Sequence, residues 1–442
     1  MHILSNMLWL DRETHGLDED KLRREFTIYG RPKFVGHELP VCKTYAETPK
    51  YFGVPRAASA RFKKKGIEWE DRTNYPNIEW PEMEFGIGET WRQGQEDAVF
   101  EMKQWFVDKY QGRLEGKCGT GKSMVSLAVA AHLGTPTLVL VHKQDLAQNW
   151  HKDARRFFPG LTLGHIQGNK WRYIGAHLTT CMAQTLWSKR GKFTETFLKS
   201  FGMIIIDEGH RYSAETFEYA PKLFPARFRL SVSATWRRRD GLEAWKQHIG
   251  PIITKIKSDR MTGRYTQVDT GIKIKAWPRM PWAVALNVLA ADTRYHTWLS
   301  NEIVKAAKKG RTILVVGDRK AQLKEVQALA HAKCINEGIN KTSGLFFGGM
   351  KPARLRKAKT CDIIYATYQM MAEGNDVPAL DTLFFATPRS DIEQVIGRLQ
   401  RIQPDKKSLL VVDPIVNGYP LFQCTASKRI GYYAKLKFKE AK

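Results

Sequence analysis

The chain has 442 residues, and its 71 lysines and arginines outnumber its 45 aspartates and glutamates, which gives a formal net charge of +26. So large a positive excess is typical of proteins that bind nucleic acid, and solubility does not require it. The apolar runs are far shorter than a membrane span and the N-terminal residues turn acidic too early for a signal peptide, so we expect a cytoplasmic protein that is not secreted.

Residues 1–85 combine short strand-like runs with turns and contain no phosphate-binding motif, so we expect a small accessory domain there, which contacts DNA. Strand-like runs alternate with helical stretches in residues 86–257, and the alternation resumes in residues 258–442. Such alternation predicts an α/β fold with two tandem, doubly wound parallel-sheet lobes. The strands that we expect in them are Thr137–Val141, Met203–Ile206, Leu230–Ser233, Thr312–Val316, Asp362–Ala366, Thr382–Ala386 and Ser408–Val412.

The first lobe contains a segment, residues 116–123, that fits the phosphate-loop pattern G-x-x-x-x-G-K-[ST]. Glycines in such a loop let several backbone N–H groups converge on one phosphate. Lys122 then reaches the terminal phosphates of ATP, and the Ser123 hydroxyl ligates Mg²⁺. The predicted nucleotide-binding residues of the loop are Gly116, Cys118, Gly119, Thr120, Gly121, Lys122 and Ser123.

Two further motifs complete a predicted triphosphatase. The apolar run Ile204–Ile206 ends in the carboxylates Asp207 and Glu208, as expected of a strand that delivers acidic groups to a nucleotide. In the second lobe, Arg398 and Arg401 are three residues apart and therefore share one face of a helix. We expect them to act as arginine fingers that stabilise the transferring phosphoryl group.

The ordered set of motifs resembles the superfamily 2 helicases. It consists of Gly116–Ser123, Asp207–His210, Ser233–Thr235, Glu373–Pro378 and Gln394–Arg401, and it spans about residues 90–440. Within that superfamily the segment Ser233–Gly241 is similar to the branch that includes the XPB and UvsW helicases and compact bacteriophage helicases. In this chain Trp236 replaces the proline usual there. The resemblance implies that both lobes are RecA-like.

The resemblance also assigns roles to individual residues. Asp207 holds Mg²⁺ through water and Glu208 orients or deprotonates the attacking water, while Arg92 and Gln95 lie at the adenine. The remaining implied residues are Gln394 in catalysis, Gly374 and Asp376 as nucleotide sensors, and His210, Ser233 and Thr235 as the coupling group. The implied nucleic-acid contacts are Lys143, Thr179, Thr180, Gln184, Arg319 and Thr367, whose donors bind backbone phosphates.

Together these features predict an ATP- and Mg²⁺-dependent DNA helicase or translocase that acts on forked or branched DNA, with 3′ to 5′ movement implied by the resemblance. Three alternatives stay open: a strand-annealing protein, a duplex-remodelling protein without processive unwinding, and an RNA helicase. Residues 254–268 alternate around a glycine-containing turn, which predicts a β-hairpin that separates strands at a fork, or else a basic linker.

Overall fold

The computed structural model describes residues 1–14, 16–30, 41–87, 89–92, 94–117, 119–211, 219–236, 243–257, 261–372, 380–400 and 406–441. Its internal contacts divide the chain into two compact units, Met1–Ser258 and Asp259–Lys442. Within the described ranges, no helix is long and apolar enough to cross a membrane.

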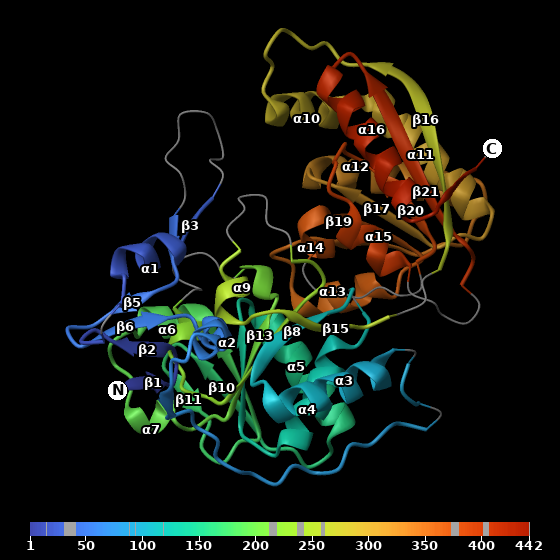
Figure 1. Cartoon of the computed structure of the whole chain (residues 1–442). Coiled ribbons are helices and arrows are strands. Elements are labelled where there is room, and N and C mark those ends of the chain that lie inside the picture. Colours follow the sequence, from blue (N-terminus) through green and yellow to red (C-terminus); the bar gives the residue numbers. More distant parts are fainter. Residues whose placement is uncertain are drawn as a thin grey trace. The chain divides into compact units, whose positions relative to one another are not determined.

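The N-terminal part of the first unit has its own small core. Its described strands form a five-stranded sheet in the order β5-β6-β2-β1-β7 and a two-stranded sheet of β3 and β4 (Figure 1). The elements are β1 (His2–Leu4), β2 (Leu8–Asp11), α1 (Glu19–Glu25), β3 (Thr27–Tyr29), β4 (Val41–Lys43), β5 (Ala46–Glu47), β6 (Tyr51–Val54), α2 (Ser59–Lys64) and β7 (Trp69–Asp71). Leucines of β1 and β2 pack with aromatic residues of β6 and α2 in this core.

Two buried arginines join this N-terminal part to the large sheet of the same unit. Arg56 donates hydrogen bonds to the carbonyl oxygens of Ala226 and Arg227, at 2.6 and 2.8 Å. Arg229 of the large sheet donates in the other direction, to the carbonyl oxygen of Asn6 at 2.7 Å. Because burial alone disfavours the charged guanidinium, it lowers the pKa of both arginines. The carbonyl oxygens around them are therefore essential hydrogen-bond partners.

The large sheet of the first unit is doubly wound. Its described strands run in the order β11-β10-β12-β9-β13-β14-β8-β15, and every pair is parallel except β10 with β11. The strands are β8 (Gln111–Glu115), β9 (Thr137–Val141), β10 (Leu163–Gln167), β11 (Lys170–Arg172), β12 (Leu178–Met182), β13 (Met203–Asp207), β14 (Phe228–Ser233) and β15 (Ile252–Lys255). The helices are α3 (Gln95–Asp108), α4 (Lys122–Leu133), α5 (Gln144–Phe157), α6 (Ala183–Ser188), α7 (Glu195–Leu198) and α9 (Trp245–His248).

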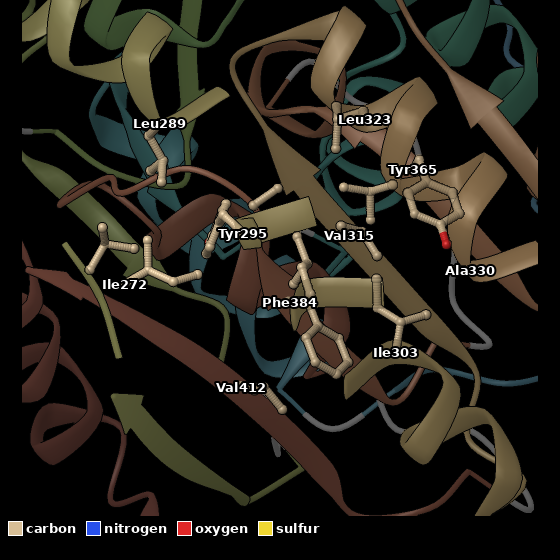
Figure 2. Packing of buried hydrophobic residues seen from close by; sticks show 14 of the residues in the cluster. Ile272, Leu289, Tyr295, Ile303, Val315, Leu323, Ala330, Tyr365, Phe384 and Val412 are labelled. Carbon is tan, nitrogen blue, oxygen red and sulfur yellow. The ribbon is translucent and has the colours of Figure 1, made fainter. Parts of the chain in front are cut away.

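The second unit has a seven-stranded sheet among its described residues, in the order β18-β19-β17-β20-β21-β16-β22. Its strands are β16 (Gly263–Lys273), β17 (Ile313–Gly317), β18 (Ser343–Phe346), β19 (Ile363–Thr367), β20 (Thr382–Phe385), β21 (Leu409–Asn417) and β22 (Lys439–Glu440). Its helices are α10 (Trp282–Ala291), α11 (Thr293–Lys308), α12 (Lys320–Asn336), α13 (Pro352–Lys359), α14 (Tyr368–Ala372), α15 (Glu393–Leu399) and α16 (Pro420–Lys435). Figure 2 shows residues of its core, such as Ile303, Val315 and Phe384, converging from α11, β17 and β20.

The predicted α/β class with two parallel-sheet lobes is confirmed. The central strands β9, β13 and β14 are buried along their whole length, as parallel strands covered on both faces must be. The predicted hairpin at residues 254–268 is wrong, because its two halves belong to different sheets. Lys255 lies in β15, which pairs with β8, whereas Tyr265 lies in β16, which pairs with β21, and its ring stacks on Tyr433 at 4.5 Å.

A buried ion pair joins the C-terminal helix α16, which carries basic and aromatic residues, to strand β21. Arg429 donates two hydrogen bonds to the carboxylate of Asp413, at 2.7 and 2.9 Å, and the two side chains are 1% and 0% exposed. Tyr433, one helical turn further on, and Gln267 also donate to this carboxylate, at 3.1 and 3.0 Å. The carboxylate therefore has four donors in the interior of the second unit, which compensate for its lost hydration.

Candidate nucleotide-binding and nucleic-acid site

The phosphate loop has the backbone geometry that its glycines predict. Gly119 and Gly121 have φ angles of 79° and 82°, a region that favours glycine, and α4 begins directly after them at Lys122. A Cβ atom on Gly116 would lie 2.6 Å from the Thr120 hydroxyl, so a side chain does not fit there. The loop therefore leads into a helix N-terminus, where backbone N–H groups are available to an anion. Cys118 lies outside the described residues.

The predicted phosphate-binding lysine is held inside its own loop. The Lys122 ammonium donates to the carbonyl oxygen of Gly116 at 2.8 Å, and the loop is tied to the sheet because the Gly116 N–H donates to the Ser233 carbonyl at 3.1 Å. Burial raises the pKa of Asp153, and the nearby Ser123 hydroxyl, predicted to ligate Mg²⁺, partly offsets that rise. Asp153 lies on α5 and is absent from the predicted site.

Gln95 supports the phosphate loop in this structure. Its side chain is 2% exposed; its oxygen accepts from the Arg92 N–H at 2.8 Å, and its amide N–H donates to the Thr120 carbonyl at 2.8 Å. Both ends of the amide are therefore engaged with backbone groups, which differs from the predicted pairing with adenine. Arg92 itself is exposed, three residues before the start of α3.

The acidic pair lies at the carboxyl end of β13. Asp207 is 8% exposed, and its carboxylate accepts hydrogen bonds from the Trp150 indole N–H and the Glu208 N–H, both at 2.9 Å. Burial and the nearby Glu208 charge raise the pKa of Asp207 to about 6. Glu208 has a φ of 52°, unusual for a residue other than glycine. The charge of Lys122 in the phosphate loop acts on Asp207, and the two neighbouring carboxylates form a setting that suits a hydrated divalent cation.

The three predicted coupling residues form one hydrogen-bonded chain. The Ser233 hydroxyl donates to the Thr235 carbonyl at 2.6 Å, so its oxygen accepts from the His210 Nδ1, which is 2.8 Å away. The same His210 nitrogen lies 3.3 Å from the Glu208 carboxylate. A path of direct contacts therefore joins Glu208 to the end of β14. Trp236, which stands in place of the usual proline, is buried, and the Arg113 guanidinium lies 4.9 Å from its ring.

The structure separates the predicted nucleic-acid residues of the first unit into two groups. Lys143 caps the start of α5, and Gln184, which is exposed on α6, donates to the carbonyl oxygen of the neighbouring His142 at 3.0 Å. Thr179 and Thr180, in contrast, are fully buried in β12. The prediction that their side chains contact phosphate is corrected, because a buried hydroxyl does not reach a nucleic-acid strand.

Two histidines form hydrogen bonds with the Thr180 hydroxyl. The His151 Nε2 lies 3.0 Å from the oxygen and the His165 Nδ1 lies 2.9 Å from it, so the threonine bridges α5 and β10. This polar group is part of the interior of the first unit. The motif resemblance contained no signal for it, since neither histidine belongs to a motif.

The second unit places its predicted residues on loops and helix ends. Arg319 caps α12 and donates to the Asn287 side chain at 2.7 Å, and Thr367 ends β19. Gln394 is partly exposed on α15, whereas Arg398 on the same helix is 4% exposed, unlike a surface arginine. Gly374, Asp376 and Arg401 lie outside the described residues.

Sequence comparisons agree with these motifs. A family model described as "Type III restriction enzyme, res subunit" matches residues 89–238, which contain the phosphate loop, the acidic pair and the coupling group. The chain is 25% identical over 427 residues to the putative ATP-dependent RNA helicase L396 of Acanthamoeba polyphaga mimivirus, an alignment covering 92% of this chain and 78% of that protein. These matches bear out the resemblance of the chain to the superfamily 2 helicases.

Two further comparisons place this helicase among its relatives. It is 26% identical over 311 residues to the probable helicase D10 of Escherichia phage T5, which covers 69% of this chain and 68% of that protein. Its fold is similar to that of the Mycobacterium smegmatis helicase Lhr, with a TM-score of 0.55 at 14% identity over 80% of this chain and 49% of that chain. The family-model match and these helicase relatives show that the protein is an ATP-dependent enzyme.

Proposed function

We propose that this helicase is a Mg²⁺-dependent motor that is stimulated by nucleic acid and that moves along DNA at forks and branches. The observation that carries the proposal is the continuous set of contacts around the phosphate loop. The loop backbone is tied to Ser233, and Ser233 is joined through His210 to Glu208. The residues that bind the triphosphate and the residue that activates water are therefore parts of one rigid arrangement.

The chemistry follows from what each side chain offers. Lys122 exchanges its loop carbonyl for the terminal phosphates, and the N–H groups at the start of α4 bind the remaining oxygens. The hydroxyl of Ser123 and the carboxylate of Asp207 are hard oxygen donors of the kind that Mg²⁺ prefers, so they would hold this ion, which would neutralise developing phosphate charge. Glu208 is proposed to hold the attacking water, and Arg398 and Arg401 keep the arginine-finger role that the motif resemblance implies.

Binding to nucleic acid is proposed to depend mainly on backbone phosphates. In the first unit, Lys143 and Gln184 are the candidate contacts. The second unit adds the short helix α13, whose sequence contains arginines and lysines and no acidic residue. Its exposed basic residues, with the one that precedes it, are Lys351, Arg354, Arg356 and Lys357. Together with the net charge of +26, this composition favours affinity that falls steeply with salt and depends little on sequence.

The choice of DNA rests on the resemblance to the XPB and UvsW branch and on the Asp207–His210 spelling DEGH, which departs from the DEAD box. The solved Lhr structure is described as bound to ssDNA and AMP-PNP, whereas the mimivirus relative is named an RNA helicase. RNA is therefore the second candidate substrate, and 3′ to 5′ movement is proposed by resemblance alone. Strand annealing without hydrolysis is disfavoured by the intact Lys122, Asp207 and Glu208.

A strand-separation assay tests this proposal. The substrates are forked DNA, a Holliday junction, an RNA–DNA hybrid and a plain duplex, each with ATP and Mg²⁺. We expect separation of the forked or branched DNA, and its loss in Lys122→Ala and Glu208→Gln but not in Glu101→Gln, an exposed position on α3. Separation of the RNA hybrid alone would make the protein an RNA helicase. Annealing that survives both catalytic variants, without any separation, would identify an annealing protein.

A further inference from the structure

Helix α5 contacts the predicted metal site at a residue that no motif includes. Trp150 is 3% exposed, and its indole N–H donates to Asp207 Oδ2 at 2.9 Å. The other carboxylate oxygen, Oδ1, accepts from the Glu208 N–H at 2.9 Å. Each oxygen of Asp207 therefore has one fixed N–H donor, and two donors on opposite oxygens fix the plane of a carboxylate. The lone pairs that remain are oriented before any cation or water arrives.

The same helix contacts the second predicted metal ligand one turn later. Asp153 lies three residues after Trp150, so both side chains project from one face of α5. The Ser123 hydroxyl lies near enough to the Asp153 carboxylate to stabilise its charged form as a hydrogen-bond donor. A serine hydroxyl has one hydrogen and two lone pairs, so donating that hydrogen to Asp153 directs the lone pairs elsewhere. They are then available to a cation at the start of α4.

We propose that Trp150 and Asp153 are positioning residues for the metal site, which orient Asp207 and Ser123 for Mg²⁺. This inference rests on the proposed function, because it concerns the same site. Outer contacts of this kind hold metal ligands in one orientation, and their loss typically weakens metal affinity by about 10–100-fold. The phosphate loop binds nucleotide through its own backbone, so affinity for nucleotide without metal does not depend on α5.

The test measures metal binding directly. Mn²⁺ affinity is followed by electron paramagnetic resonance in the presence of ADP, and the affinity for a fluorescent ADP analogue is measured in Mg²⁺ and in EDTA. For Trp150→Phe, which keeps the ring and removes the N–H, we expect about 10–100-fold weaker Mn²⁺ binding and unchanged nucleotide affinity in EDTA. Trp105→Phe is the matched control, because it loses an indole hydrogen bond to the backbone of Gln111.

Asp153 provides an independent pair of variants. Asp153→Ala removes the acceptor for the Ser123 hydroxyl, whereas Asp153→Asn keeps an oxygen acceptor, so we expect weak Mn²⁺ binding in the first and near-parent binding in the second. If Trp150→Phe also loses nucleotide in EDTA, the Asp153 pair decides the question. Parent-like Mn²⁺ affinity in Trp150→Phe and Asp153→Ala would overturn the inference. If the parent protein binds nucleotide with the same affinity in Mg²⁺ and in EDTA, the metal assignment in the proposed function is refuted instead.

Discussion

Replacing Arg429 by methionine tests the interior of the second unit. The substitution keeps an unbranched side chain of similar length but removes the two hydrogen bonds to Asp413, whose side chain is 0% exposed. Tyr433 and Gln267 remain as neutral donors, so the carboxylate stays buried without its cation. Breaking a buried pair in this way costs about 3–5 kcal/mol.

For a unit that spans Asp259–Lys442, this loss corresponds to a fall of about 6–20 °C in its melting temperature. Peptide-resolved hydrogen exchange assigns the effect to a location, and we expect β21 and α16 to exchange about 10²–10⁴-fold faster. Lys428→Met is the matched control, because Lys428 precedes Arg429 on α16 and is exposed. If the two variants exchange and melt alike, the buried pair does not have the stabilising role inferred here.

Three other substitutions or conditions give distinct outcomes. Gly121→Ala should abolish binding of a fluorescent ADP analogue, because φ is 82° and the new Cβ would collide with the Gln95 amide. In the control Gly160→Ala, φ is 83° but the new Cβ has no atom within 4 Å, so this variant should bind the analogue normally. Thr180→Val should lower the free energy of unfolding by about 1–3 kcal/mol, because His151 and His165 lose their shared hydrogen-bond partner. The affinity for single-stranded DNA should stay unchanged. Weaker DNA binding at unchanged stability would restore Thr180 as a nucleic-acid contact. Since the folded pKa of Asp207 is about 6, above the ordinary aspartate value of 3.8, the metal-free protein should lose up to about 3 kcal/mol of stability as pH rises from about 4 to 6. Denaturant unfolding in EDTA across that range should show this component in the parent and not in Asp207→Asn.

The strands and the phosphate loop were predictable because their signals are local. Apolar runs such as Thr137–Val141 are short and bounded, and the structure has a strand at those residues. Gly119 and Gly121 adopt positive φ angles that other residue types disfavour, and this loop pattern leads into a helix at Lys122, so its position follows from residue type. Local patterns of this kind need no knowledge of distant partners.

The wrong predictions concern segments whose structure depends on residues far away in the sequence. Residues 254–268 alternate like a hairpin, but each half pairs with a strand far away in the chain, β8 or β21. Thr180 carries a polar group on a central strand, and its partners, His151 and His165, belong to no motif. Trp150 looks like an ordinary apolar-face residue of an amphipathic helix until the structure places its N–H against Asp207.

The most direct test of the account is the rate of ATP hydrolysis, measured with and without single-stranded DNA, in the parent and in Glu208→Gln. Glu208 contacts His210, which joins it to Ser233, and the Ser233 carbonyl accepts a hydrogen bond from Gly116 of the phosphate loop. The account predicts that DNA raises the parent rate, and that Glu208→Gln still binds a fluorescent ATP analogue but hydrolyses ATP at least about 100-fold more slowly, since a positioned base contributes about 10²–10⁴-fold. Hydrolysis by Glu208→Gln at the parent rate, with the same response to DNA, would contradict it.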